Sequence, residues 1–379
     1  MEQINRLMEQ AVKDNVFPGG VLLVSKDGAI RFFEAYGYAN IFSKRRMTKD
    51  TVFDLASLTK TLATTLAVMK LVQESELDIE QTLESVLQEF QNTEKGQIRI
   101  RHLLGHYSGL PDHRLYYERL RLLSPDKRRN ALRSLLVKEP LIYPVGKKVI
   151  YSDLGFMILG WIVERVSGKR LDRFVDEAIY KTLGLENLFF VEVPPFPPFG
   201  EGGNSFFAGK DVFKKKWPRE LNFAATELCP WRNILLEGIV HDDNACASGG
   251  IEGHAGLFGT AENIYILLSE LLKNFQSCFS ACVFHRDILK VFFERQKDTD
   301  RALGFDMPAP RDASCGRFFS KRSIGHLGFT GTSFWMDLDL SVFVILLTNR
   351  VHPSRDNVKI KAFRPELHDA VMKSLAITT

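Results

Sequence analysis

The sequence has few of the features that mark a specialised class of protein. Five cysteines in 379 residues, at positions 229, 246, 278, 282 and 315, are too sparse and odd in number for a disulfide framework. We therefore expect a reduced, cytoplasmic protein. No apolar run is long enough for a membrane span, and the amphipathic N-terminal segment lacks the apolar centre of a signal peptide. Repeats and low-complexity segments are also absent.

Charge of one sign is scarce as well. The net charge is only +4, and three short basic runs, at 44–46, 127–129 and 214–216, lie far apart without interleaved aromatic residues. This pattern argues against a nucleic-acid partner and leaves a small-molecule substrate as the expected ligand. The apolar fraction of 45% is ordinary for a globular protein, and the length allows one large domain or two lobes. The composition does not define an oligomeric state.

One stretch carries a chemical signal. Residues 53–72 place Ser57 and Lys60 three positions apart, followed by apolar residues at helical spacing. Ser57 would lie at the helix start, where free N–H groups favour developing negative charge. A lysine held in an apolar helix should lose proton affinity through desolvation and could take the proton of the serine.

The spacing alone has a simpler explanation, since serine is also a common N-cap of a core helix. A second match in the chain, Ser124-Pro125-Asp126-Lys127, has the form of such a cap, with proline at the first helical position. The interpretation of Ser57 therefore depends on partners elsewhere in the chain.

The remaining periodicities outline a mixed architecture. We expect a helix over the first 15 residues, a hairpin over 18–40, and mainly helices from 124 to 188, including one that ends at Gly168. Two strands should follow from His326 onward, and a helix over 364–375 should close the chain. Residues 194–220 form a long segment without consistent periodicity.

Histidines gather at two places, but neither fits a metal motif. His102 and His106 have ligand spacing on a helix, but no glutamate stands between them and glycines break the pattern. Around 241–254, two histidines, two aspartates and an asparagine lie among glycines without a metal-ligand spacing. We expect turns and hydrogen-bonded loops at both places, with no metal and no cofactor.

Three motifs in one order resemble the serine β-lactamase and penicillin-binding protein family, particularly its class C-like branch with related esterases and peptidases. Ser57 and Lys60 match Ser-x-x-Lys, and Tyr151-Ser152-Asp153 resembles Tyr-x-Asn with the continuation LGWIVERVSG. His326-Leu327-Gly328 matches the third motif, Lys-Thr-Gly or His-x-Gly. The segment IRHLLGHYSGLPD is also similar to one that this branch carries between the first two motifs.

The resemblance implies an α/β fold of the α+β type. A mainly antiparallel sheet is assembled from both termini and flanked by helices, and a mostly helical lobe is inserted into it. We therefore expect residues 1–57 and 246–379 to form the sheet lobe and residues 58–245 the helical lobe, as one catalytic unit with the site between them.

The family roles can be carried over to matching positions. Ser57 would attack a carbonyl and form an acyl-enzyme, while Lys60 and Tyr151 would share the base work, each lowering the proton affinity of the other. The backbone N–H groups of Ser57 and Phe329 would form the oxyanion hole. Substrate-binding roles fall to four residues: Asp153, His326, Gly328 and Thr330.

Two positions depart from the family pattern. Asp153 replaces an asparagine, and His326 replaces the lysine of true β-lactamases, so it would be charged only at lower pH. We therefore do not expect efficient hydrolysis of β-lactams. The leading expectation is an amide or ester hydrolase acting on a small substrate, with a cell-wall peptide or muropeptide as one candidate. A carboxylesterase and a non-catalytic binding or scaffold protein are the alternatives.

Overall fold

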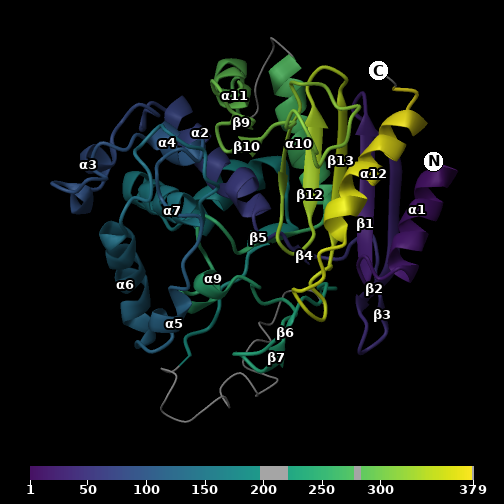
Figure 1. Ribbon diagram of the computed structural model, residues 1–379, viewed down its shortest axis with the longest axis horizontal. Helices are drawn as coiled ribbons and strands as arrows, with labels where there is room; N and C mark the ends of the chain where they lie inside the picture. Colours follow the sequence, from purple (N-terminus) through teal and green to yellow (C-terminus); the bar gives the residue numbers. More distant parts are fainter. Residues whose placement is uncertain (197–220, 277–282, 378–379) are drawn as a thin grey trace.

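The computed structural model describes residues 1–196, 221–276 and 283–377 of the chain (Figure 1). Its largest element is an antiparallel sheet in the order β3-β2-β1-β13-β12-β11-β10-β9. The strands of this sheet are β1 Gly19–Lys26, β2 Ala29–Asn40, β3 Arg45–Arg46, β9 Arg301–Ala302, β10 Phe305–Asp306, β11 Ile324–Leu327, β12 Ser333–Asp337 and β13 Val342–Thr348. The mixed α/β class with an antiparallel sheet built from both chain ends is thus confirmed.

The two central strands come from opposite ends of the sequence. β1 pairs with β13 from Gly20 opposite Thr348 to Lys26 opposite Val342. Both strands are mostly apolar and are buried over nearly their whole length, because both faces of the sheet are covered. On one face α1 Glu2–Lys13 and α12 Ile360–Ser374 lie side by side, and α10 Ala261–Gln276 covers the other (Figure 1).

The segment between the sheet-forming parts is mostly helical and lies on the far side of α10 from α1 and α12 (Figure 1). Its helices are α2 Leu66–Gln73, α3 Leu83–Val86, η2 Gln88–Phe90, α4 Ile100–Leu104, α5 Tyr117–Leu120, α6 Pro125–Lys138, α7 Asp153–Ser167, α8 Leu171–Val175, η3 Asp176–Tyr180, η4 Lys181–Leu183 and α9 Asp243–Ala247. A further helix, α11 Arg286–Phe293, packs on α10 and α2. The division of the chain into lobes at residues 57 and 245 stays a prediction.

A small sheet connects the two parts and fixes the position of Ser57. Strand β4, Phe53–Asp54, pairs with β8, Leu257–Gly259, which also pairs with β5, Leu188–Phe190. A separate short hairpin, β6 Leu228–Cys229 with β7 Ile234–Leu235, lies at the edge of the molecule. The helix after β4 begins at Leu58, contains the π-helical segment η1, Lys60–Thr65, and continues as α2. π-helical turns occur frequently at functional sites.

Most of the expected elements are confirmed. The N-terminal helix, the hairpin, the helix start at Pro125 and the left-handed Gly168 at the end of α7 all occur. The expectation of two strands from His326 onward was wrong in one respect. This region contributes to three strands, the first of which is β11. The last helix begins at Ile360, four residues before the expected start, because Pro365 fits within its early turns.

Some expectations fall elsewhere. Most of the segment 194–220 lies outside the described residues, as do the cysteines Cys278 and Cys282. The described cysteines, Cys229, Cys246 and Cys315, are buried and free. In the described ranges no helix is long and apolar enough to cross a membrane.

Candidate active site

Ser57 lies in a tight connection between β4 and the helix that begins at Leu58. The residue before it, Ala56, has a φ of 53°, an uncommon backbone conformation for a residue with a side chain. The carboxylate of Asp54 stabilises this turn by accepting hydrogen bonds from the N–H groups of Ala56 at 2.9 Å and His241 at 2.6 Å. The strained turn presents Ser57 to a cavity.

The expected contact between Ser57 and Lys60 is present. Lys60 is fully buried, and its Nζ donates to Ser57 Oγ at 3.0 Å. The same ammonium donates to the carbonyl oxygen of His254 at 3.3 Å. The one-turn spacing therefore brings the serine hydroxyl and the lysine amine together, as the sequence predicted.

The expectation that Lys60 loses proton affinity in the folded protein was wrong. Burial lowers its pKa, but the carboxylate of Asp153, with Oδ1 2.8 Å from Nζ, outweighs burial, and the pKa is raised above its usual range. Burial likewise raises the pKa of Asp153, but Lys60 reverses this and holds the pKa well below its usual range. The resting site thus contains a charged pair, not a neutral amine.

Tyr151 faces both Ser57 and Lys60. Its ring centroid lies 4.8 Å from Lys60 Nζ, and its ring packs against His106 at 4.7 Å. Burial raises the pKa of Tyr151, although the charge of Lys60 and hydrogen bonds to Lys60 and Ser57 oppose the rise. The expectation that each group lowers the proton affinity of the other is therefore wrong for Lys60, whose pKa is raised by the negative charge that Tyr151 can carry.

The position of the second motif depends on a histidine that sequence analysis assigned only to a turn. His106 is buried, has a φ of 62°, and accepts a hydrogen bond from the N–H of Ser152 at 3.0 Å. The hydroxyl of Ser152 caps α7 by accepting from the N–H of Gly155 at 3.2 Å. These contacts fix Tyr151 just before α7 and Asp153 in its first turn.

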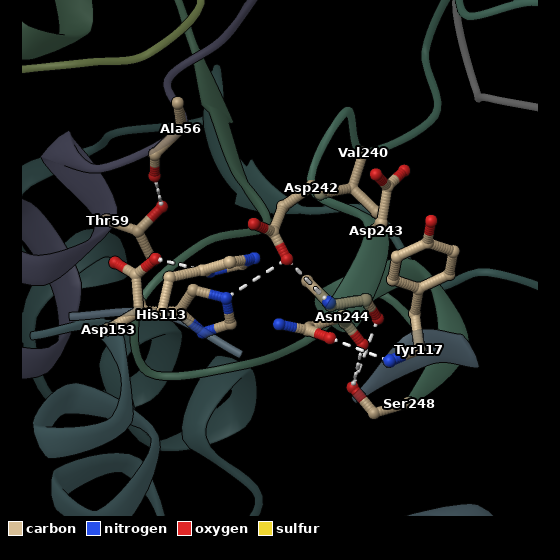
Figure 2. Close-up of polar contacts among 12 residues, drawn as sticks. Ala56, Thr59, His113, Tyr117, Asp153, Val240, Asp242, Asp243, Asn244 and Ser248 are labelled. Carbon is tan, nitrogen blue, oxygen red and sulfur yellow. Dashed lines mark hydrogen bonds and ion pairs between the residues drawn. The ribbon is translucent and has the colours of Figure 1, made fainter. Parts of the chain in front are cut away.

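Asp153 also contacts a histidine at the edge of the cavity. Its Oδ2 lies 3.3 Å from Nδ1 of His113, whose pKa is raised by this contact (Figure 2). A second pair, His254 Nε2 and Asp242 Oδ1 at 3.0 Å, lies close by. Sequence spacing missed these partnerships because the residues come from three separate segments.

In the described part of the chain, one group of three side chains has potential metal-ligating atoms within 4.8 Å of one another. The group consists of Asp153, Asp242 and His254. Each carboxylate already has a partner, since Lys60 contacts Asp153 and His254 contacts Asp242. The expectation of a hydrogen-bonded loop fits this arrangement, and the absence of a metal requirement stays a prediction.

The third motif lies on β11 and faces the site from the sheet. His326 is 2% exposed, its Nδ1 lies 2.9 Å from the carbonyl oxygen of Leu327, and its ring is 5.9 Å from that of Tyr151. Burial lowers the pKa of His326 to about 4. This imidazole is therefore neutral near pH 6.5, where an unperturbed histidine would be half charged.

The turn after β11 brings backbone donors to the nucleophile. Gly328 is required there because a Cβ would lie 2.0 Å from Thr332 Oγ1 and 2.8 Å from the carbonyl oxygen of Leu55. Among the described residues, the N–H groups of Ser57 and Phe329 have no hydrogen-bond partner. Two unused amide donors beside a serine fit the expected oxyanion hole.

We expected Thr330 to bind substrate, but it does not line the cavity. It is 1% exposed, and its hydroxyl donates to the carbonyl oxygen of Asp54 at 2.7 Å. Its side chain therefore connects the turn to the segment before Ser57. This structural role fits its buried position better than a contact with substrate does.

The cavity around these groups has a volume of about 660 Å³, within the range of small-molecule sites. Exposed apolar side chains at its wall belong to Leu115, Phe329 and Val358. Several cationic side chains also line it: Arg301, Arg350, Arg355, Lys361 and Arg364. The sequence contained no spacing signal for these cations because four of them follow the third motif by 22 residues or more.

Relatives with similar sequences have hydrolase names. An N-acetylmuramyl-L-alanine amidase of Bacillus subtilis (strain 168) is 32% identical over 93% of this chain and 81% of its own length. A putative D-alanyl-D-alanine carboxypeptidase of Escherichia coli (strain K12) is 31% identical over 93% of this chain and 82% of its own length. These names point to a hydrolase.

Known structures share the fold. The octameric penicillin-binding protein homologue from Pyrococcus abyssi superimposes with a TM-score of 0.71 at 19% identity, over 99% of this chain and 77% of that one. EstCE1, a hydrolase with promiscuous acyltransferase activity, gives 0.70 at 20% identity, over 96% and 98% of the two chains. The model of the family described as Beta-lactamase matches residues 4–367. The chain therefore belongs to the beta-lactamase family.

Proposed function

We propose that the protein is a serine hydrolase that cleaves an amide or ester bond through an acyl-enzyme on Ser57. The observation that carries this proposal is the 3.0 Å contact between Lys60 Nζ and Ser57 Oγ beside a cavity. The N–H groups of Ser57 and Phe329 have no hydrogen-bond partner among the described residues. They can therefore donate hydrogen bonds to the developing oxyanion.

The chemistry proceeds in two halves. Ser57 Oγ attacks the substrate carbonyl and transfers its proton to the coupled Lys60 and Tyr151 set, and the collapsing intermediate expels an amine or alcohol that takes a proton. Water then cleaves the acyl ester and regenerates the serine. Lys60 rests in its charged form beside Asp153. The site can accept the proton of Ser57 only after it has lost one proton from this resting form.

The relatives and the cavity support one substrate class. Two relatives are named as an N-acetylmuramyl-L-alanine amidase and a putative D-alanyl-D-alanine carboxypeptidase. The cavity has arginines, a lysine, five aspartates and apolar walls, a lining that suits a small polar substrate such as a peptide or muropeptide. A carboxylesterase is the second candidate, because an acyl-enzyme can form from an ester as well as from an amide and EstCE1, a hydrolase with promiscuous acyltransferase activity, shares the fold.

The test combines labelling with substrate profiling. We expect a fluorophosphonate probe to label the protein once, with the added mass mapped to the peptide that contains Ser57. Muramoyl-L-alanine, D-Ala-D-Ala peptides, p-nitrophenyl esters and nitrocefin should then be compared by kcat/KM. A faster amide than ester supports the amidase, the reverse supports the esterase, and no labelling or turnover supports the non-catalytic alternative.

A further inference from the structure

The turn Gly328–Thr332 is attached to the nucleophile segment through its side chains. Thr330 Oγ1 donates to the carbonyl oxygen of Asp54 at 2.7 Å, and Thr332 Oγ1 donates to that of Leu55 at 3.2 Å. These contacts set the distance between Ser57 and the turn. They leave the orientation of the peptide groups within the turn to other contacts.

Two arginines contact the carbonyl oxygens of this turn. Arg364, on α12, donates from Nη2 to the oxygens of Gly328 at 3.3 Å and Thr332 at 2.9 Å. Arg350, just after β13, donates from Nε to the oxygen of Phe329 at 2.8 Å, and its Nη2 contacts the same oxygen. Both guanidinium groups therefore lie on the side of the turn that carries these carbonyl oxygens, at the wall of the cavity.

The burial of these arginines is unusual. Arg350 is 7% exposed and Arg364 is 5% exposed, and Arg364 Nε has no hydrogen-bond partner. Throughout the described ranges neither side chain forms an ion pair with a carboxylate. Burial and the neighbouring Arg350 lower the pKa of Arg364 to about 10, which still leaves it charged at neutral pH. Two adjacent buried cations without counter-ions cost folding free energy, so a functional reason for them is expected.

The geometry of one peptide group supplies this reason. The carbonyl of Gly328 and the N–H of Phe329 belong to the same peptide bond, which is trans because the only cis bond among the described residues is His352–Pro353. In a planar trans peptide the C=O and N–H point in opposite directions. The oxygen also accepts from the N–H of Gly331 at 3.1 Å, so Arg364 and the turn together hold it and direct the N–H of Phe329 away from α12. A cationic donor on the oxygen also polarises the amide and strengthens the N–H as a donor.

We propose that Arg364, assisted by Arg350, is a positioning residue that orients and polarises the oxyanion-binding peptide Gly328–Phe329. This inference rests on the proposed function, since it presupposes that the Phe329 N–H binds the oxyanion. The two positive charges also stabilise the tetrahedral intermediate, where negative charge develops, more than the uncharged ground state.

The test separates kcat from KM in Arg364 variants. Arg364→Met removes the charge and both donors at similar length, and Arg364→Lys keeps the charge with one flexible ammonium. Because losing an oxyanion donor outright costs about 100-fold to 1,000-fold in kcat, we expect Arg364→Met to lower kcat about 10-fold to 100-fold with KM within about twofold. Arg364→Lys should recover part of the loss, and an aryl boronic acid, which forms a tetrahedral adduct with serine, should bind the Met variant proportionally more weakly.

Arg322→Met is the matched control, because Arg322 pairs with Asp339 at an exposed turn and does not contact the turn after β11. It should keep the wild-type kcat. Melting temperatures of all variants identify any unfolding. If the Met variant does not fold, Arg364→Lys tests the positioning role instead. We expect this variant to lose kcat while its KM stays constant.

The outcomes distinguish the two proposals. An Arg364 variant that folds and keeps kcat and boronate affinity within twofold would overturn the positioning role, while labelling of Ser57 would leave the serine hydrolase standing. A parallel rise in KM with unchanged kcat would also overturn it, since the arginine would then act on substrate binding. A wild-type protein that is not labelled at Ser57 would remove the basis of both.

Discussion

The ammonium of Lys60 lies closer to the carboxylate of Asp153, at 2.8 Å, than to the hydroxyl of Ser57, at 3.0 Å. In the related family pattern this position holds an asparagine, which carries no charge. The carboxylate therefore changes the resting state of the base, because it holds a proton on Lys60 that the reaction requires to be absent.

Asp153→Asn should shift the pH dependence of the reaction. Without the carboxylate, burial is the largest remaining influence on Lys60, so its pKa falls and the base form appears at lower pH. We expect the alkaline rise of kcat/KM to move down by about one pH unit or more. The measurement is a pH–rate profile of both proteins with one neutral ester. An unchanged profile would show that Lys60 does not set the rate.

Ser57→Ala should abolish turnover without unfolding the protein. The loss of an activated nucleophile costs about a thousandfold to a millionfold in rate, and the small side chain removed leaves the melting temperature nearly unchanged. Ser124→Ala is the control, because Ser124 stands in the only other Ser-x-x-Lys sequence and precedes α6 as an N-cap. Comparable activity in the two variants would refute the assignment of the nucleophile.

The charge of His326 should not change with pH near neutrality. Since burial lowers its pKa to about 4, the imidazole stays neutral from about pH 5.5 upward. The ratio of kcat/KM for an anionic and a neutral substrate with the same leaving group should therefore be flat between about pH 5.5 and 8. An unperturbed histidine would instead change this ratio near pH 6.5. A step in the ratio at that pH, abolished by His326→Asn, would show that His326 does carry a charge there.

His368 should make the protein less stable as the pH falls. It is fully buried, its Nδ1 lies 2.8 Å from the carbonyl oxygen of Ser314, and burial lowers its pKa to about 4. The unfolded chain takes up this proton near pH 6.5, whereas the folded protein does so only near pH 4. The free energy of unfolding is therefore highest above pH 6.5 and falls by up to about 1.4 kcal/mol per pH unit between these values.

His368→Gln should reduce this slope, because glutamine does not titrate. The measurement is urea unfolding at several pH values between 4.5 and 7.5. His285→Gln is the control, since His285 is exposed at the start of α11. Equal slopes in wild type and both variants would show that another group causes the loss of stability.

The sequence predicted those parts of the site that depend on local spacing. The three-residue step from Ser57 to Lys60 and the strand position of His326 were correct because each belongs to one helix or one strand. The protonation of Lys60 was not predictable, because its partner Asp153 comes from α7, which reaches the site only after folding. The same holds for Thr330, whose hydroxyl contacts Asp54 rather than the cavity.

The central pairing of β1 with β13 has a consequence for synthesis in the cell. Between 316 and 328 positions separate these partners in sequence, so most of the chain must leave the ribosome before the first strand can hydrogen-bond on that side. Contacts of such long range also slow folding. Because the turn that faces Ser57 is held between β11 and β12, a nascent chain cannot assemble the nucleophile with its oxyanion donors until this last stretch is made.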